Sequence, residues 1–582
     1  MEQPRTSFNV DSTPLLASEG GPESKKVEKR FGKFDPNKTS FTRKKQIGFV
    51  LSIILFVAIS LNDVHGEDEK ETKKFVKVNE MLAILSVMVC WWLAEVVNVY
   101  VTSMIPILLF PAFSIKSTKE TAGRYMSDLS WLFIAAFSLA AAMKSVNLHK
   151  RLALFLLRLF GTKPLGILLG FATPAFCLSL FMSNTGTTAL LIPLADGVIE
   201  ATLGSLKDDE ELKNAVIHFS KGVTLAIGYS ATIGGSGTLV ATAPNGVLLD
   251  FVQKDFNYTI PFGKWMLAFI PMGLCLLAAN VTILYNMYVK KAMLKVNFSM
   301  DAINEEYKKL GKMKFDECVV AMCFVTAVLL VVFGDIAVGN THGYCEKCEN
   351  EALLRLFNNS SMNCNDIVKK DVCETVRGRW KKYFGTGSFF LFGAFPLFII
   401  PSKLRPGETL LEWKAARKNI PWGLIILIGG GLAVAEGFKS TETSKFLASY
   451  LQGLAHVNQS IAVFILVGSV SFLTEVTSNT ATTSILVPIL FELATQNQLH
   501  PLKFGFSVCL GANLAFMLPI ATGPNGVMYG TNKFDGFFGY ARPGFLVNVC
   551  GIIIASTFIL MVASPIFKLD VSYDDMDEQW KK

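Results

Sequence analysis

Two short strings of hydroxyl and amide side chains are the part of this sequence best suited to binding a small ion. The strings SNTGTTALLIP (183–193) and SNTATTSILVP (478–488) are identical at most of their positions. Each is followed further along the chain by a PNGV string, in TAPNGV (242–247) and TGPNGV (522–527). Two matching strings in the same order indicate an internal repeat whose corresponding parts meet at one site.

The chemistry that these strings offer is ion binding. Ser, Thr and Asn oxygens can face a cation, and their O–H and N–H groups can donate to an anion. A helix that stops inside a membrane leaves free N–H groups at one stub, which suit a carboxylate or sulfate. It leaves free carbonyl groups at the other stub, which suit Na⁺. Neither tip contains Lys or Arg, so a divalent anion there needs charge compensation from helix dipoles and co-bound cations. This predicts coupling to Na⁺. The alternative, that the strings are only helix caps and packing, does not account for their duplication.

The composition predicts a membrane protein. Of the 582 residues, 51% are hydrophobic and 18% are charged, and long apolar runs alternate with short charged loops. The net charge of +8 comes from basic clusters that flank apolar runs, as in the positive-inside rule. There is no basic domain and no reading motif, which argues against a nucleic-acid partner.

The apolar runs predict an all-α polytopic protein with about eleven transmembrane helices and two re-entrant hairpins, at 152–205 and 441–497. The order of span, hairpin and broken span recurs, and the two hairpins enter from opposite sides. We therefore expect two inverted repeats, at 45–315 and 316–566. The predicted spans are 46–62, 80–98, 99–114, 128–146, 219–251, 262–288, 316–336, 384–401, 420–438, 501–530 and 541–566.

The termini and one polar loop fix the expected orientation. Residues 1–44 read as a disordered cytoplasmic tail without a cleavable signal peptide, and the span count places 567–582 outside. The loop 337–382 is then extracellular, where disulfides and N-glycosylation occur. A zinc knuckle is the alternative for its cysteines, but a properly spaced second pair is missing. The loop's sequons start at Asn358 and Asn359, and its cysteines are Cys345, Cys348, Cys364 and Cys373.

One acidic residue lies beside the second tip. Glu475 occupies the position that Leu180 has beside the first tip. An ionisable group at membrane depth is a candidate for pH sensing or cation binding. The alternative, which the sequence favours, is a structural carboxyl that accepts hydrogen bonds.

Four further segments resemble one family of transporters. These are 77–95, 99–113, 147–154 and 421–437, and the segment Phe516-x-x-Pro519-Ile520-Ala521-x3-Asn525 resembles that family's signature. Over about 45–566 the chain resembles the divalent anion/sodium symporters, and in particular their animal sodium-coupled di- and tricarboxylate branch. Asn513 and Met528 stand where that signature usually has Ser and Val. The family's Gly-Thr-Pro-Pro-Asn in the first broken span is here Ala241-Thr242-Ala243-Pro244-Asn245.

The resemblance implies a set of site residues, a homodimer and an elevator-like motion of a substrate domain against a scaffold. By it, one Na⁺ is held by Ser179, Ser183, Asn184 and the carbonyl of Ala241. The other Na⁺ is held by Thr474, Thr477, Asn479 and the carbonyl of Ala521. The substrate then contacts Asn184, Thr185, Thr242, Asn479, Thr480 and Thr522.

The expected function is secondary active import of di- and tricarboxylates, such as succinate and citrate, with Na⁺ across the plasma membrane. A sodium-independent carboxylate exchanger and a sodium–sulfate symporter on the same fold remain alternatives. A channel needs a continuous pore with charged rings or a carbonyl filter, which inverted hairpins do not supply. An enzyme is not expected, because both tips lack His, Cys and Lys.

Overall fold

The computed structural model describes residues 43–61, 69–206, 209–256, 258–289, 296, 298, 301–332 and 386–576. Within these residues the architecture is helical, with a single isolated β-bridge between Pro401 and Thr409. Nearly all of the predicted tail 1–44, the Cys-rich loop with its cysteines and sequons, and the last residues of the predicted tail 567–582 lie outside the described residues.

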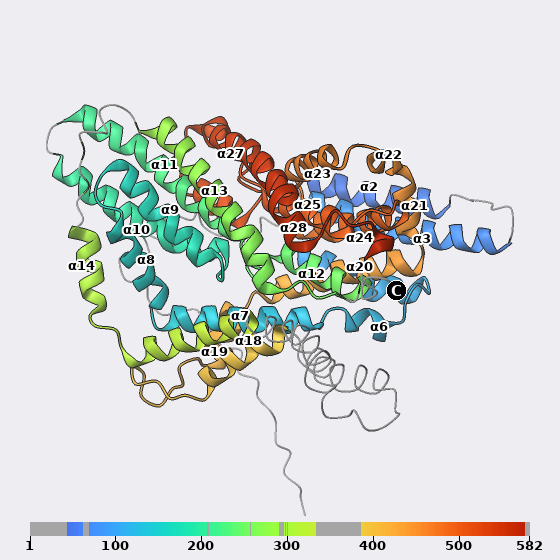
Figure 1. Ribbon diagram of the computed structural model, residues 1–582, viewed down its shortest axis with the longest axis horizontal. Helices are drawn as coiled ribbons and strands as arrows, with labels where there is room; N and C mark the ends of the chain where they lie inside the picture. Colours follow the sequence, from blue (N-terminus) through green and yellow to red (C-terminus); the bar gives the residue numbers. More distant parts are fainter. Residues whose placement is uncertain are drawn as a thin grey trace, which may run out of the picture.

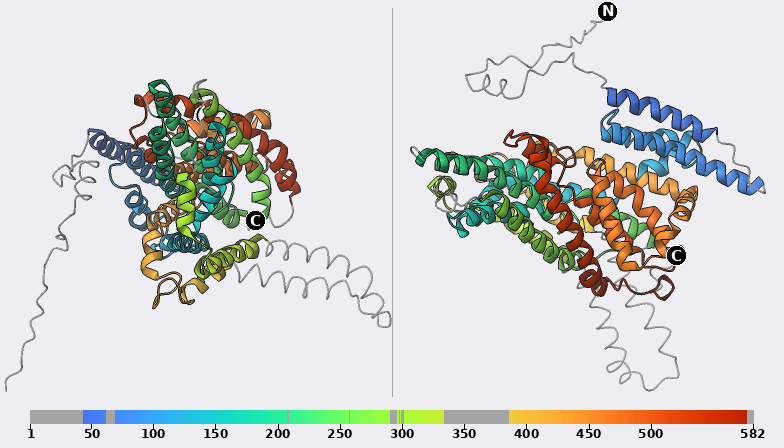
Figure 2. Two further views of the ribbon diagram at one scale, coloured as in Figure 1. Left: turned by 90° about the vertical axis from the view of Figure 1, so that its left-hand side faces the viewer. Right: turned by 90° about the horizontal axis from the view of Figure 1, so that it is seen from above.

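The first described helices correspond to the first predicted spans, although α3 begins at Glu69, before the predicted start of the span 80–98. The predicted span 99–114 consists of two short helices, because Pro106 at the start of the second one fits only the first turn of a helix. The helices are α2 (Arg43–Ser60), α3 (Glu69–Ala94), α4 (Val99–Thr102), α5 (Ile105–Ala112), α6 (Thr118–Gly123) and α7 (Asp128–Ser145). In Figure 2, α2 and α3 lie side by side along one edge of the molecule. Much of the apolar surface of α2 is exposed, including Ile47 and Ile54, as expected for a helix that faces lipid.

The first hairpin is shorter than the predicted range 152–205. Residues 148–159 form a separate helix, and Gly161 turns the chain with a positive φ of 79° before Pro164 starts the first arm. The arms end and begin at the predicted tip around Ser183. The helices are α8 (Leu148–Leu159), α9 (Pro164–Ser179) and α10 (Asn184–Ser205).

A broken span and two further helices complete the first half. The break falls at 235–242, within the Gly- and Thr-rich stretch that predicted it. The segment 289–315, which lies between two predicted spans, contains the short helix α14. The helices are α11 (Glu210–Gly234), α12 (Ala243–Phe256), α13 (Phe262–Tyr288) and α14 (Asp301–Leu310).

The second half repeats this order. The hairpin arms are α23 and α24, and the short helices α21 and α22 occupy the start of the predicted range 441–497. The helix Phe315–Val332 opens this half. It is followed by α18 (Thr386–Ala394), η2 (Phe395–Phe398), α19 (Trp413–Asn419), α20 (Trp422–Ser440), α21 (Thr443–Tyr450), α22 (Gln452–Ala455), α23 (Gln459–Thr474), α24 (Asn479–Gln496), α25 (Pro501–Asn513), α26 (Gly523–Tyr529), α27 (Gly536–Phe558), η3 (Ile559–Ala563), α28 (Ser564–Phe567) and η4 (Tyr573–Asp575).

The packing of the helices follows the internal repeat. In the first half α11 packs against both arms, α9 and α10, and in the second half α25 packs against both arms, α23 and α24. The hairpins also reach across the repeat, because α10 packs against α26 and α24 packs against α12. Figure 1 shows α9 and α10 towards one end of the molecule and α23 and α24 towards the other end. Each broken span is therefore enclosed by arms of both hairpins.

Two contacts join connecting segments that lie far apart in the sequence. Lys144 donates to Asn419 at 3.4 Å. The backbone N–H of Tyr573 donates to the carbonyl of Gln498 at 3.2 Å. Seven helices in the described residues are long and apolar enough to cross a membrane, and shorter apolar helices accompany them.

Candidate functional site

The first tip places two oxygen atoms without partners close together in sequence. Ser183 caps α10, and its Oγ accepts from the N–H of Gly186 at 3.5 Å. Ser179 Oγ, at the end of α9, and Asn184 Oδ1, at the start of α10, are both buried. Neither has a hydrogen-bond partner among the described residues. Because buried polar groups are normally paired, these two oxygens are suited to a ligand such as a cation.

The first broken span lies directly against this tip. A methyl group placed on Gly235 would come within 2.6 Å of Asn184 Nδ2 and 2.6 Å of Thr242 Cγ2, so only glycine fits between them. The tip, the end of α11 and the start of α12 therefore meet at one point. Thr238 donates its hydroxyl to the carbonyl of Leu180, which ties the break to the hairpin.

One amide side chain closes the first break. Asn245 Nδ2 donates to the carbonyl of Gly235 at 3.0 Å and to that of Thr238 at 2.7 Å. Without Asn245 the carbonyl of Thr238 would be unpaired and that of Gly235 would keep only a 3.5 Å bond from the hydroxyl of Thr242. Unpaired carbonyls are the usual liability of a helix that stops in a buried place. The Asn of the PNGV string therefore has a structural role in closing the break, in addition to its position at the site.

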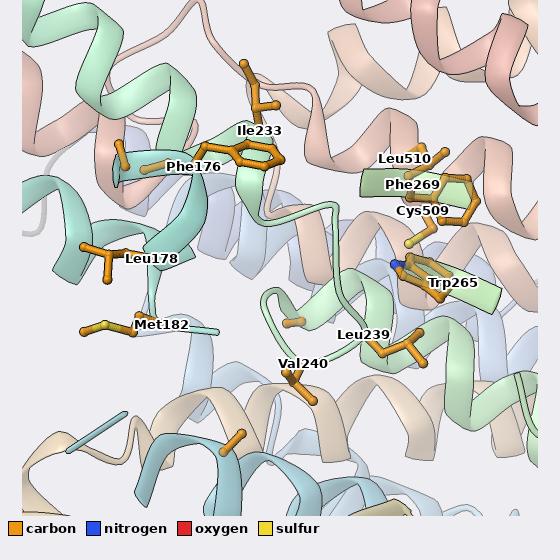
Figure 3. Packing of buried hydrophobic residues seen from close by; sticks show 14 of the residues in the cluster. Phe176, Leu178, Met182, Ile233, Leu239, Val240, Trp265, Phe269, Cys509 and Leu510 are labelled. Atoms are coloured by element: carbon orange, nitrogen blue, oxygen red, sulfur yellow. The ribbon is translucent and has the colours of Figure 1, made fainter. Parts of the chain in front are cut away.

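Apolar packing fixes the path of the break. Figure 3 shows Phe176 of α9 next to Ile233 at the end of α11, with Leu239 and Val240 on the irregular segment that follows. The indole N–H of Trp265 donates to the carbonyl of Ser236 at 3.1 Å. All four apolar residues are buried, so the irregular backbone is enclosed by protein, as membrane depth requires.

In the second tip, the side-chain oxygens that correspond to those of Ser179 and Asn184 are hydrogen-bonded. Thr474 donates to Asn479 Oδ1 at 2.5 Å, and its Oγ1 lies 3.4 Å from the carbonyl of Ala512. The hydroxyls of Thr477 and Thr482 are 2.6 Å apart. Thr474 and Asn479 correspond in the repeat to Ser179 and Asn184. The same positions are therefore bonded to each other in one half and unpartnered in the other.

The second break is closed by the same amide device as the first. Asn525 Nδ2 donates to the carbonyls of Ala515 at 3.1 Å and Leu518 at 2.9 Å. The acceptors lie ten and seven residues before the Asn, as they do in the first half. A methyl group on Gly523 would overlap Thr185 Oγ1, so the first tip also touches the second break.

Glu475 is a hydrogen-bonded structural carboxyl in this structure. Its oxygens accept from the backbone N–H groups of Phe516 at 2.8 Å, Met517 at 2.9 Å and Leu518 at 2.8 Å. Asn548 Nδ2 donates a further bond at 2.8 Å. The side chain is 4% exposed, so its charge is held inside the protein by four donors. This geometry matches the structural alternative among the two that the sequence left open.

A bond between the halves was not expected from the sequence. Asn513 Nδ2 donates to Asn245 Oδ1 at 2.8 Å, and the thiol of Cys509 lies 3.2 Å from the same oxygen. Asn513 drew attention only as a departure from the family signature. Its partner lies 268 residues away, and no local pattern predicts such a pair.

Some of the predicted site residues lie against one another in the structure, and others are placed nearby along the chain without a direct contact to them being seen among the described residues. Asn184, Thr185 and Thr242 meet at the two breaks, as described above, and Thr522 caps α26. Thr480 is buried on α24, and Ala241 and Ala521 lie in the irregular segments that precede α12 and α26.

The arrangement can bind ions of both signs without a formal charge of its own. Hydroxyl and amide oxygens of the tips and backbone carbonyls of the breaks are ligands for a hard cation such as Na⁺, which here would be cargo. The N-terminal turns of α10, α24, α12 and α26 supply donors and positive dipole ends for an anion. The described residues contain no group of three or more His, Cys, Asp or Glu side chains that could hold a resident metal ion.

Comparison with known proteins decides the family. Residues 75–569 match the model of the sodium:sulfate symporter transmembrane region. The chain belongs to this symporter family. It is therefore a polytopic membrane transporter with helical spans, as predicted, and the family consists of symporters, not enzymes.

Relatives match almost the full length of the chain. The sodium-dependent dicarboxylate transporter SdcS of Staphylococcus aureus strain USA300 is 33% identical over 552 residues, which cover 94% of this chain and 97% of the relative. SdcS of Staphylococcus saprophyticus is 32% identical over 525 residues, which cover 90% and 91%. The solved Alcanivorax borkumensis YdaH transporter, whose topology is described as unusual, is 11% identical with a TM-score of 0.46 and covers 90% of this chain and 99% of that chain.

Proposed function

We propose that this symporter carries di- and tricarboxylates, such as succinate and citrate, together with Na⁺. The observation that carries the proposal is the pair of broken spans, each closed by an Asn and touched by a tip that contains no Lys or Arg. A multivalent anion at such a site needs cations beside it, and the unpartnered oxygens of Ser179 and Asn184 offer a place for one. The relatives named as sodium-dependent dicarboxylate transporters support the same substrate class.

The proposed site uses the residues of both halves. The anion contacts Asn184, Thr185 and Thr242 from the first half and Asn479, Thr480 and Thr522 from the second half. One Na⁺ is coordinated by Ser179, Ser183, Asn184 and the carbonyl of Ala241. The second Na⁺ is coordinated by Thr474, Thr477, Asn479 and the carbonyl of Ala521.

The proposal includes a cellular setting. The protein acts as a homodimer in the plasma membrane, with its N-terminus in the cytoplasm and its C-terminus outside. In this orientation Asn358 or Asn359 is glycosylated and Cys345, Cys348, Cys364 and Cys373 form disulfides. Glycosidase treatment is then expected to shift the protein on a gel. An unshifted band, with the loop protected from labelling in intact cells, contradicts the orientation.

Uptake of radiolabelled succinate, citrate and sulfate into oocytes, with Na⁺ replaced by choline, tests the function. We expect saturable uptake of the carboxylates that depends on Na⁺. Equal uptake in Na⁺ and choline would point to a sodium-independent exchanger. Sulfate uptake that succinate does not inhibit would point to a sulfate symporter.

A further inference from the structure

A surface at one end of the molecule combines basic and apolar side chains and is built from three separate segments. These are α8, the end of α14 with the start of the helix Phe315–Val332, and the loop 402–405. Figure 1 shows α8 and α14 close together at the end of the molecule that carries the first hairpin. Counting the predicted spans from a cytoplasmic N-terminus predicts that all three segments lie on the cytoplasmic side of the membrane.

Two consecutive buried carboxylates hold the three segments together. Glu317 binds Arg151 of α8 through two nitrogens, at 2.8 and 3.1 Å, and Arg151 also donates to the carbonyl of Gly311 at 2.9 Å. Asp316 accepts from the hydroxyl of Ser402 at 2.5 Å and from the N–H of Lys403 at 2.9 Å. A bidentate Arg–carboxylate pair fixes geometry as well as charge. The surface is therefore rigidly built, and its outward side chains have defined positions.

The outward side chains on this surface are strongly basic. Residues 148–163 and 307–315 contain four Lys or Arg each and no Asp or Glu. Arg158 lies over the ring of Tyr307 with its guanidinium carbon 4.6 Å from the ring centroid, and Lys403 lies 4.2 Å from the centroid of Phe315. Lys312 and Lys314 are exposed, and neither has an acidic partner among the described residues. The positive charge of the surface is thus available to a ligand.

Exposed apolar side chains lie next to these charges. On α8, Leu152, Phe155 and Leu159 are spaced three and four residues apart and form one exposed stripe, with Phe155 48% exposed. Met313 and Phe315 alternate with Lys312 and Lys314 and are 49% and 45% exposed. An apolar stripe flanked by basic residues is the pattern of a helix that lies in the interface of a membrane.

The opposite end of the molecule has a different charge arrangement. There Arg124 and Lys116 both pair with Glu436, at 3.0 and 3.3 Å, and Lys439 pairs with Asp255 at 3.0 Å. The repeat partner of α8 is α21, and it contains one basic residue, Lys445. At that end these three basic side chains are therefore neutralised by acidic partners, unlike Lys312 and Lys314.

We propose that the surface formed by Arg158, Lys312, Lys314 and Lys403, with the apolar stripe of α8, binds the headgroup of an anionic phospholipid. The phosphate contacts the basic side chains and the acyl chains pack on the exposed apolar residues. Only a lipid satisfies both features at once, because a soluble polyanion leaves the apolar stripe in water. The combination of basic and apolar contacts also favours a lipid over an acidic protein. The proposal does not depend on which anion the protein transports.

The test is to count lipids retained on the purified full-length protein. The protein is equilibrated with phosphatidylglycerol or phosphatidylcholine in detergent, and native mass spectrometry counts the bound molecules. The triple variant K312Q/K314Q/K403Q removes three exposed charges, and K119Q/K445Q/K568Q is its matched control at three exposed lysines outside the proposed surface. Removing each lysine is expected to weaken binding of phosphatidylglycerol roughly fivefold, so the triple variant weakens it on the order of a hundredfold. The control keeps the affinity of the wild type.

A second variant tests the apolar part of the surface. L152S/F155S keeps every charge, and we expect it to weaken phosphatidylglycerol binding as well. Gel filtration checks that each variant is folded. Equal retention by the wild type and the triple variant overturns the proposal, as does equal loss in the control. Complete displacement of the lipid by glycerol phosphate overturns it in favour of a soluble polyanion, and phosphatidylcholine retained as well as phosphatidylglycerol leaves no role for the charges.

Discussion

In the first half of the molecule, the break between α11 and α12 is tied to the hairpin by Thr238, whose hydroxyl donates to the carbonyl of Leu180. In the second half, the break between α25 and α26 is tied to the hairpin by Glu475, which takes the place of Leu180. Both breaks are closed by an Asn that donates to the carbonyls ten and seven residues before it. The two halves share the Asn that closes the break. They differ at the position beside the tip, which is Leu180 in the first half and Glu475 in the second.

The two halves show that breaks with the same closing Asn can be tied to their hairpins by different groups. A neutral bond from a side chain to a carbonyl is enough to hold the first break. The second break is held by a buried carboxylate with four donors, and bonds to a charged acceptor are stronger than neutral ones. The second half therefore has a buried carboxyl with four hydrogen-bond donors beside its tip, whereas the first half has unpartnered oxygens at Ser179 and Asn184.

Replacement of Glu475 by Leu, the residue of the first half, is expected to have the largest effect. It leaves the backbone N–H groups of Met517 and Leu518 and the Asn548 amide without an acceptor, whereas the N–H of Phe516 keeps a 3.2 Å bond to Asn548 Oδ1. Each unpaired buried donor costs about 1–3 kcal/mol. We expect loss of most folded protein, measured as melting temperature in detergent and as surface expression. Glu436→Gln, at a half-buried ion pair, is the matched control and is expected to be mild. A melting temperature like that of the wild type for Glu475→Leu would show that the carboxyl does not hold the break.

The two closing amides are expected to differ in their contribution to stability. Asn245→Ala leaves the carbonyl of Thr238 and the amide of Asn513 unpaired and leaves the carbonyl of Gly235 with only a 3.5 Å bond from Thr242. Asn525→Ala leaves only the carbonyl of Ala515 unpaired, because the carbonyl of Leu518 also accepts from the N–H of Ala521 at 3.1 Å. The Oδ1 of Asn525 has no partner among the described residues. At about 1–3 kcal/mol for each unpaired buried group, Asn245→Ala lowers the melting temperature further. If Asn525→Ala is the more damaging variant, the bond between the halves does not contribute as described.

Thr238→Val is expected to destabilise the first break by about 1 kcal/mol. The substitution keeps the shape of the side chain and removes the bond to the carbonyl of Leu180. Thr282→Val is the control, because its hydroxyl donates within one exposed helix turn. Thermal unfolding in detergent measures both, and equal melting temperatures for the two variants would remove Thr238 from the account.

The smallest effect concerns the segment after the last span. The side chain of Lys503 is 5% exposed and binds Asp570 at 2.8 Å. This bond and the hydrogen bond from Ser564 lower the pKa of Asp570 below its ordinary value of 3.8. A lowered pKa stabilises the fold at neutral pH, and this stabilisation is lost as the pH falls below 3.8. Asp570 is 77% exposed, so the contribution is below about 1 kcal/mol. Asp570→Asn is expected to flatten that part of the pH profile of thermal unfolding, and an unchanged profile contradicts the assignment.

The sequence predicts the breaks and the tips because their causes are local. Gly and Pro interrupt a helix wherever they stand, and the duplicated strings around Ser183 and Ser478 show which interruptions correspond. For the same reason the bounds of α13 match the predicted span 262–288. The start of the first hairpin is less well predicted, because α8 is amphipathic and its leucines continue the apolar pattern of the arm, from which only the short segment 160–163 separates it.

Partners that lie far apart in sequence are not predictable in this way. Glu475 stands out as an ionisable residue in an apolar segment, but its acceptor role depends on backbone groups about forty residues away. The bond from Asn513 to Asn245 crosses between the halves, and no periodicity of either segment indicates it. Such contacts depend on how the two repeats are packed together, and one sequence alone contains no signal for that.

The most direct test of the account is Na⁺-dependent succinate uptake by Asn184→Ala and Asn479→Ala, measured beside their surface expression. Each substitution removes an acceptor oxygen and two donors from the proposed shared site, and we expect about a five- to hundredfold loss of substrate affinity at either position. Ser484→Ala is the control, because the hydroxyl of Ser484 has no partner in the described part of the chain and its loss leaves nothing unpaired. If both Asn variants reach the surface and take up succinate with the affinity and Na⁺ dependence of the wild type, the two tips do not form the transport site.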